Sequence, residues 1–432
     1  MLEYIPVLVL VISFLVLLVL GVPVAWSIGI ASLLTMLVSI PAMPAFTTVA
    51  QRIATGLDSF ALLAIPFFIL SGQLMNKGGI AHRLIDFAKT LVGSLPGGLA
   101  HINVIAAMLM GAIAGSAMAA ASAMGGILGP RMEKEGYSKE FGAAVNITSA
   151  TTGLVIPPSN TLIVYSLASG GASIAALFLA GYLPGILTGL FLMIVAAVWA
   201  KKKGFPVGER SKLKDVLTTF IDAFPSLLLL VLVIGGIVAG IFTATEASAV
   251  AVLYTLILAF WYKEIAWKDL PGILLHSVET TAMVMLLIGT SMSMSWVMSY
   301  ENIPQEVSNA LLSVSDNKIV ILLIINMILL FVGIFMDMTP AVLIFTPIFL
   351  PVVTEFGMDP VHFGIVMVLN LCIGLCTPPV GSVLFVGVGI ANTTIEKVIK
   401  PLLPLFIAML IALMMVSYWP ALSLWLPESF GY

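Results

Sequence analysis

Long uninterrupted runs of apolar residues set the first limit on how this chain can fold. A helix needs about 20 apolar residues to cross a bilayer, and the chain holds many runs of that length. Only 9% of its residues are charged, against about 25% in a soluble domain. This composition excludes a soluble enzyme and a disordered protein, and because the apolar runs are continuous rather than alternating, they also exclude an outer-membrane β-barrel. The composition predicts an all-α polytopic membrane protein.

The expected spans follow directly from these runs. They cover 4–20, 22–40, 61–76, a stretch at 98–200 interrupted by a charged loop at 131–140, and then 225–241, 243–261, 282–299, 319–355, 361–391 and 398–420. The first run lacks a basic start and a cleavage site, so we expect it to be retained as a span. Net charge is −3 without a basic block, which gives no reason to expect nucleic acid as a partner.

An internal duplication becomes visible when the chain is shifted by 221 residues without a gap. The pair Pro157-Pro158 then falls on Pro378-Pro379, Gly153 falls on Gly374, and Pro130 falls on Pro351. The apolar runs superpose as well, and so do two amphipathic segments at 79–95 and 301–317. A shared Pro-Pro pair at one ungapped offset is hard to obtain by chance. We therefore expect two repeats, each with five spans, an amphipathic arm helix and a re-entrant hairpin.

An odd number of spans in each repeat requires the second repeat to be inverted in the membrane. With both termini on the periplasmic side, 16 of the 18 lysines and arginines fall inside, and only Arg52 and Lys318 fall outside. This matches the positive-inside rule for an inner-membrane protein. The expected domains are scaffold and arm helix of repeat 1 (1–97), transport half 1 (98–200), a cytoplasmic connector (201–222), scaffold and arm helix of repeat 2 (223–318) and transport half 2 (319–426).

Two hairpins and two interrupted helices carry the polar residues inside these spans. The hairpins turn around 111–116 and 333–340, and the interruptions lie at 152–161 and 374–382. Consecutive prolines remove backbone donors and disfavour helix at the preceding residue, which leaves carbonyl oxygens unpaired. In a membrane such carbonyls need protein groups or a bound ion. The arrangement is typical of secondary transporters with a site near the midplane.

These segments supply the candidate ligands for Na⁺ and for a carboxylate substrate. We expect one sodium site at Gly115, Ser116, Gly153 and Asn160, and a second at Asp337, Thr339, Gly374 and Thr377. The substrate is expected between them, near Ser159, Thr161, Gly381 and Ser382. Two simpler interpretations stay open: proline-kinked helices that bind nothing, and Asp337 as a helix cap.

Motifs for reaction chemistry are missing from the sequence. It contains no H-E-x-x-H, Walker A or C-x-x-C motif, and its four histidines are scattered without ligand spacing. Cys372 and Cys376, one helical turn apart in an apolar run, are expected to be core residues. We expect neither an enzyme nor a transition-metal site, and no catalytic residue is assigned.

Several longer motifs resemble the large membrane subunit of tripartite ATP-independent periplasmic (TRAP) transporters. They are Gly56–Gly79 (GLDSFALLAIPFFILSGQLMNKGG), Pro96–Ala100 (PGGLA), the Gly115-Ser116 pair and Ile156–Ser159 (IPPS). The resemblance implies a Na⁺-driven importer of organic acids with an elevator mechanism. It also implies two partners, a periplasmic substrate-binding protein and a small four-span membrane subunit.

The chain departs from the family pattern at two places. Ala120 stands where many members carry an acidic residue near the first hairpin tip. The run at 159–166 (SNTLIVYS) replaces a pattern of dicarboxylate members and resembles the sialic-acid branch. The alternatives are a self-sufficient Na⁺/dicarboxylate symporter of similar architecture and, from another class, a channel or an intramembrane enzyme.

Overall fold

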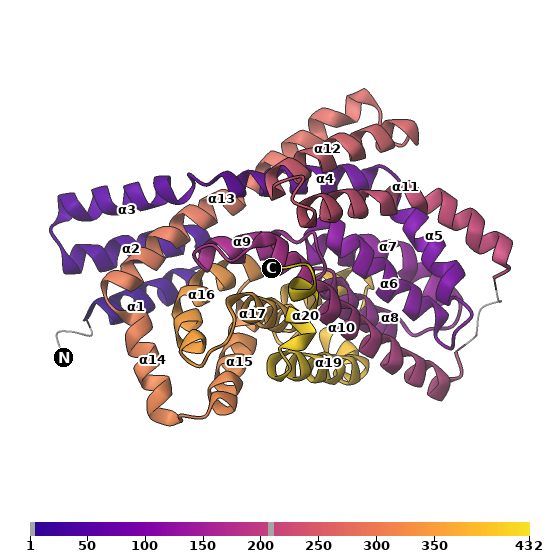
Figure 1. Ribbon diagram of the computed structural model, residues 1–432. Coiled ribbons are helices and arrows are strands. Elements are labelled where there is room, and N and C mark those ends of the chain that lie inside the picture. Colours follow the sequence, from indigo (N-terminus) through magenta and orange to yellow (C-terminus); the bar gives the residue numbers. More distant parts are fainter. Residues whose placement is uncertain (1–4, 206–210) are drawn as a thin grey trace.

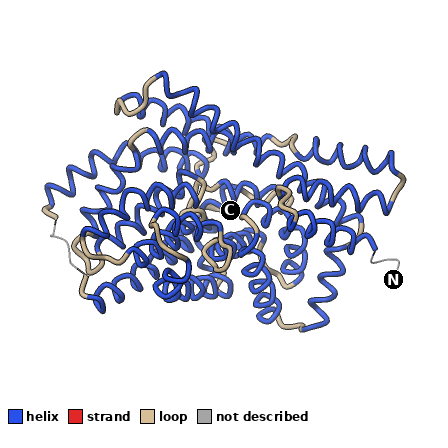
Figure 2. The backbone as a smooth tube through the Cα atoms, turned by 180° about the vertical axis from the view of Figure 1, so that it is seen from behind, coloured by secondary structure: helices blue, strands red, loops and turns tan. Residues whose placement is uncertain are grey.

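The computed structural model describes residues 5–205 and 211–432, and every regular element in them is a helix (Figures 1 and 2). The first repeat contains α1 (Ile5–Val19), α2 (Val24–Ser39), α3 (Ala42–Gly56), the short 3₁₀ helix η2 (Phe60–Leu63), α4 (Ala64–Lys77), α5 (Ile80–Val92), α6 (Gly98–Ala114), α7 (Ala117–Lys134), α8 (Lys139–Thr152), α9 (Asn160–Ala168) and α10 (Ile174–Lys203). The second contains α11 (Leu213–Val238), α12 (Ala244–Trp261), η3 (Trp267–Asp269), α13 (Leu270–Tyr300), α14 (Ile303–Val314), α15 (Lys318–Phe335), α16 (Met338–Glu355), α17 (Pro360–Gly374), α18 (Ser382–Ile390), α19 (Ile395–Tyr418) and α20 (Ala421–Ser429).

The helix boundaries repeat with the offset found in the sequence. Shifting α7 by 221 residues gives the bounds of α16, and shifting α8 gives those of α17 to within one residue. Both interrupted helices are broken at the expected Pro-Pro pairs, each of which contains a cis peptide bond. The arm helices are present as α5 and α14. The protein is an all-helical polytopic membrane protein built from two inverted repeats.

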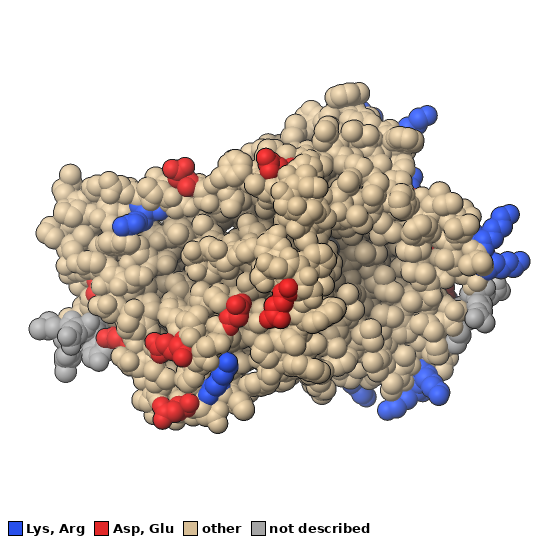
Figure 3. Space-filling view, in the orientation of Figure 1, with Lys and Arg blue, Asp and Glu red and all other residues tan. Residues whose placement is uncertain are grey.

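Lengths and exposed surfaces fit a bilayer environment. Eight of the described helices are long and apolar enough to cross a membrane, and α1, α2, α6 and α17 are shorter apolar helices. Along α10, Ile186, Leu190, Ile194 and Val198 are about half exposed at a spacing of four residues, which makes an outward apolar stripe. Figure 3 shows most basic side chains toward the ends of α10, α11 and α12, while acidic ones lie over the opposite half.

The repeats differ in the segment after the second helix. In repeat 2, α13 is one continuous helix, whereas the equivalent segment of repeat 1 is divided into α3 and α4. The break is fixed from two sides: Gly56 lies against the Met292 side chain, and the Thr245 hydroxyl donates to the Phe60 carbonyl at 2.8 Å. Helix α3 was not expected, because polar residues such as Gln51 and Arg52 interrupt its apolar pattern.

The connector between the repeats is shorter than the expected 201–222. Helix α10 continues through Lys203, and α11 begins at Leu213, twelve residues before the apolar run that predicted it. Helices continue into the expected connector because charged residues at a helix end need not interrupt the helix: they reach water beyond the hydrocarbon core. Residues 206–210, also within that range, lie outside the described part. The proposed domain boundaries themselves stay a prediction.

The two repeats exchange contacts at their hairpins. Hairpin one (α6 and α7) packs on α8 and also on α18 of the other repeat, while hairpin two (α15 and α16) packs on α17 and on α9. Helix α8 contacts α19, and α17 contacts α10. The core of the molecule therefore belongs to both repeats, and neither hairpin depends on its own repeat alone.

One hydrogen bond between the two repeats allows the contribution of these contacts to stability to be tested. The Tyr165 hydroxyl on α9, fully buried, donates to the Pro360 carbonyl at the start of α17 at 2.6 Å. We expect Tyr165→Phe to lower the free energy of unfolding by about 1 kcal/mol, because the carbonyl loses its donor inside the protein. A melting curve in detergent measures this change. The conservative variant Tyr432→Phe, at an exposed hydroxyl, serves as the control.

Candidate functional site

A cavity of about 480 Å³ lies where the two hairpin tips meet the rest of the molecule. Its walls come from both tips, from the start of α9, and from single residues of α18 and of the loop before it. The opposite walls are formed by α4 and α13. Both hairpins therefore turn beside the same cavity, as the sequence analysis expected of two re-entrant hairpins.

The first tip, at the turn between α6 and α7, is formed by Gly115 and by Ser116, the N-cap of α7. Gly115 has a left-handed backbone (φ 60°), and Ser116 begins α7 as its N-cap, accepting from the Ala119 amide at 3.3 Å. A Cβ on Gly115 would lie 2.6 Å from Nδ2 of Asn160, so this amide group packs directly on the tip. Oδ1 of Asn160 is buried without a hydrogen-bond partner. The tip thus brings an unpaired oxygen beside a serine hydroxyl.

The second tip is Met336-Asp337, between α15 and α16. Asp337 is the N-cap of α16, but its side chain makes no capping hydrogen bond. The side chain is exposed to the cavity, and among the described residues no basic nitrogen lies within 4.0 Å of it. Thr339 lines the same wall. An unpaired carboxylate inside a membrane protein is costly, which favours a cationic ligand.

Close glycine contacts hold each hairpin on its interrupted helix. A Cβ on Gly111 of α6 would lie 2.5 Å from Cα of Gly153, and a Cβ on Gly374 would lie 2.5 Å from Cα of Gly333 on α15. These are equivalent contacts in the two repeats. Small residues let helices approach closely in membranes. Here they place the ends of the hairpins beside the unwound segments.

The structure brings together about half of the expected site residues. Gly115, Ser116, Asn160, Thr161, Asp337 and Thr339 line the cavity. Gly153, Ser159, Gly374, Thr377, Gly381 and Ser382 do not line it. Their assignment to sodium or substrate therefore stays a prediction.

The residues behind the cavity still have features of ligand groups. Oγ of Ser159 and Oγ of Ser382 are both buried without a hydrogen-bond partner. The Thr377 hydroxyl donates to the Ile373 carbonyl at 2.7 Å, which leaves its oxygen lone pairs free. The donor set around the tips is one carboxylate with hydroxyl, amide and carbonyl oxygens, which suits a hard monovalent cation. The described residues contain no group of three or more His, Cys, Asp or Glu that could hold a metal ion.

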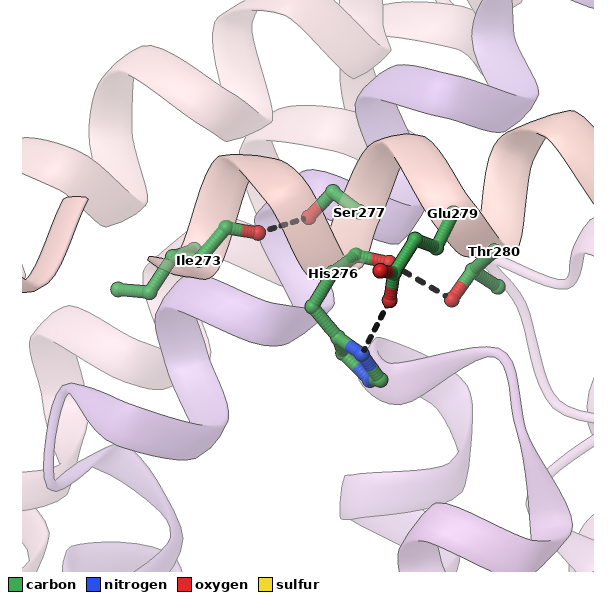
Figure 4. A network of polar contacts seen from close by, with 5 residues as sticks. All are labelled: Ile273, His276, Ser277, Glu279 and Thr280. Atoms are coloured by element: carbon green, nitrogen blue, oxygen red, sulfur yellow. Dashed lines mark hydrogen bonds and ion pairs between the residues drawn. The ribbon is translucent and has the colours of Figure 1, made fainter. Parts of the chain in front are cut away.

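The sequence does not indicate the side of the cavity that α4 and α13 form. Gln73 and Asn76 of α4 and His276 and Thr280 of α13 line it. Figure 4 shows His276 beside Glu279, with Nδ1 and Oε2 3.8 Å apart. The sequence marks Glu279 as a repeat equivalent of Asp58, but nothing in it tells which helix face turns toward the hairpins.

Comparison with known proteins connects this geometry to a family. The family model described as "Tripartite ATP-independent periplasmic transporter, DctM component" matches residues 11–422. The chain is 58% identical over 430 residues to the uncharacterized protein YgiK of Salmonella typhimurium, with 99% of each chain covered. It is 41% identical over 413 residues to the isethionate TRAP transporter permease protein DctMQ of Oleidesulfovibrio alaskensis, covering 95% of this chain and 65% of that protein.

One solved structure extends the comparison to the fold. The Alcanivorax borkumensis YdaH transporter aligns with a TM-score of 0.67 at 12% identity, covering 87% of this chain and 88% of that one. Further relatives, 35–40% identical, are named as large permease proteins for C4-dicarboxylates, sialic acid or 2,3-diketo-L-gulonate. The chain belongs to the DctM component family of tripartite ATP-independent periplasmic transporters.

Proposed function

We propose that this chain is the large permease subunit of a TRAP transporter that imports an organic acid together with Na⁺. The observation that carries the proposal is the cavity shared by both hairpin tips, which holds a carboxylate without a basic partner among the described residues and an amide oxygen without a hydrogen-bond partner. Transport is proposed without chemical conversion of the substrate. The partners are a small four-span membrane subunit and a periplasmic binding protein.

Sodium would be held at the two tips. Ser116, Asn160 and the carbonyls near Gly115 and Gly153 form one proposed cage, and Asp337, Thr339, Gly374 and Thr377 form the other. Bound ions would neutralise the Asp337 charge and fix the tips, so that a carboxylate substrate can bind between them. The helix starts after each break add partial positive charge near Ser159, Thr161, Gly381 and Ser382.

The proposed mechanism is an elevator. The cavity lies between the hairpins and the helices α4 and α13, which we assign to the scaffold. With the N- and C-termini periplasmic in the bacterial inner membrane, Asn76 lies near the proposed cytoplasmic end of α4, next to Lys77, and His276 lies in the second turn of α13, whose start is proposed to be cytoplasmic. In this orientation the cavity would open toward the cytoplasm, which we propose corresponds to the release state of the cycle.

The substrate class is an organic acid. The run at 159–166 favours sialic acid, while relatives of similar identity are named for isethionate, C4-dicarboxylates and 2,3-diketo-L-gulonate. Each of these solutes carries at least one acidic group, a sulfonate in isethionate and two carboxylates in a C4-dicarboxylate, and they differ in size. Sialic acid is therefore the first substrate to test, followed by a C4-dicarboxylate and isethionate.

Uptake into proteoliposomes tests the proposal. The vesicles hold this chain with a small four-span subunit, and they receive labelled solute with or without an inward Na⁺ gradient and a binding protein. We expect uptake only when both are supplied. Uptake with Na⁺ alone would favour the self-sufficient Na⁺/dicarboxylate symporter, and uptake indifferent to Na⁺ for every solute would contradict the coupling.

A further inference from the structure

A second cavity, of about 230 Å³, lies away from the hairpin tips. It is formed at the base of hairpin one by α7, by the start of α8 and by the end of α18. Glycines make up much of its wall, and polar groups occur at its mouth and floor. The lining glycines are Gly125, Gly126, Gly129, Gly142 and Gly387.

Two buried amides form the floor of this cavity. Asn146 on α8 is 3% exposed, and its Nδ2 donates to the Ala121 carbonyl at 2.8 Å. Its Oδ1 has no hydrogen-bond partner. Asn103 on α6 is 1% exposed, and its Oδ1 accepts from the Ser149 hydroxyl at 3.0 Å. A buried oxygen without a donor is costly, and a ligand in the cavity would remove that cost.

The mouth of the cavity carries an ion pair. Oε2 of Glu133 and Nζ of Lys139 are 3.5 Å apart, and both side chains are partly exposed. Lys139 is seven residues before Asn146 on α8, about 10 Å along the helix. Helix α18 ends at Ile390 in the cavity wall, and a helix C-terminus has a partial negative charge. Below the mouth, the described lining residues therefore offer one unpartnered side-chain oxygen, Oδ1 of Asn146, and no basic side chain.

We propose that this cavity binds a hydrated alkali cation, with Oδ1 of Asn146 as its inner ligand and Glu133 as the charge at its mouth. Neutral oxygens and one carboxylate suit Na⁺ or K⁺ better than a divalent ion, which takes more carboxylate ligands. The site is separate from the hairpin tips and does not depend on the proposed transport function. Along α8, Asn146 is followed by Ser149 three residues later and by Gly153, at the end of the helix, four residues after that. The cavity floor therefore lies on the face of α8 that ends at the break.

Cysteine labelling of the purified full-length chain in detergent tests the proposal. Gly126 is exposed and lines the cavity, and a Cβ there meets no atom within 4 Å, while both native cysteines are buried. We expect the Gly126→Cys thiol to react with a maleimide at least threefold more slowly in NaCl or KCl than in N-methyl-D-glucamine chloride. Comparing the two alkali salts identifies the preferred ion. Gly272→Cys, with equally open space on α13, should react at one rate in all salts.

Charge variants at the mouth make the test specific. In the Gly126→Cys background, Glu133→Gln should raise the half-protecting cation concentration roughly fivefold, and Lys139→Gln should lower it by a similar factor. Asn146→Ala should remove the protection, and Asp337→Asn should leave it intact because the tips are elsewhere. Equal rates in all salts would mean that the cavity holds only water, and rates that follow the anion would indicate an anion site. Either of these results would overturn the proposal. So would a loss of the cation-dependent protection of the Gly126→Cys thiol when Asp337→Asn is added.

Discussion

Asp337→Asn is expected to abolish sodium-dependent uptake while leaving the assembled protein intact. The carboxylate is exposed to the cavity and has no basic partner within 4.0 Å among the described residues, so a cation is its natural counter-charge. A charge pair at 4 Å is worth about 4 kcal/mol at an effective dielectric constant of 20, close to a thousandfold in ion affinity. Initial uptake rates across a range of Na⁺ concentrations in proteoliposomes measure this loss.

Asparagine is chosen because it separates the ion-binding role from the helix-cap role. Asn caps helices as well as Asp does, so a purely structural cap would tolerate the change. The structure shows no capping bond from this side chain. Glu306→Gln, which removes an exposed carboxylate from α14, is the matched control and should transport normally. Unchanged sodium dependence in Asp337→Asn, with Glu306→Gln also normal, would sink the assignment.

The parts of the fold that could be predicted from the sequence are those fixed by local chemistry. A Pro-Pro pair ends a helix wherever it occurs, so the breaks after Gly153 and Gly374 were predictable, as was the turn at Gly115. Because the two repeats align at an offset of 221 residues, each prediction made for one repeat applied to the other as well. Both hairpin tips therefore lie where the sequence analysis placed them, to within a few residues.

Features that depend on lateral packing could not be predicted. An apolar helix shows no polar face to orient it, so the sequence could not tell that His276 and Thr280 of α13 face the cavity. Helix α3 was not predicted because polar residues such as Gln51 and Arg52 interrupt its apolar pattern. The extent of the cavity also depends on packing, so the sequence could not tell that Ser159 and Ser382 lie outside its walls.

Contacts between glycines that are far apart in the sequence could not be predicted either, although each glycine could be read from the sequence. The offset aligned Gly153 with Gly374, but it could not show which backbone each one touches. In the structure, the partners are Gly111 and Gly333 on the first helices of the two hairpins. The two unwound segments are therefore in close contact with the first helices of the hairpins, and this contact can be tested by substitution.

Gly153→Ala is expected to reduce uptake at least tenfold and to lower the melting temperature in detergent by several degrees. The added Cβ would overlap the Gly111 backbone and lie 2.8 Å from the Ala107 carbonyl oxygen. Overpacking a tight contact costs about 1–3 kcal/mol, and here the atoms that must move are backbone atoms. Hairpin one would shift away from α8, and the tip would lose its position beside Asn160.

Two further alanine variants separate this effect from a general effect of glycine replacement. Gly374→Ala, at the equivalent contact with Gly333, should behave like Gly153→Ala because the repeats use the same packing. Gly126→Ala is the control: its Cβ meets no atom within 4 Å, and alanine is favoured over glycine inside a helix by about 1 kcal/mol. It should be neutral or slightly stabilising. If Gly153→Ala transports and melts like Gly126→Ala, the contact does not position the hairpin, and the coupling between tip and break is wrong.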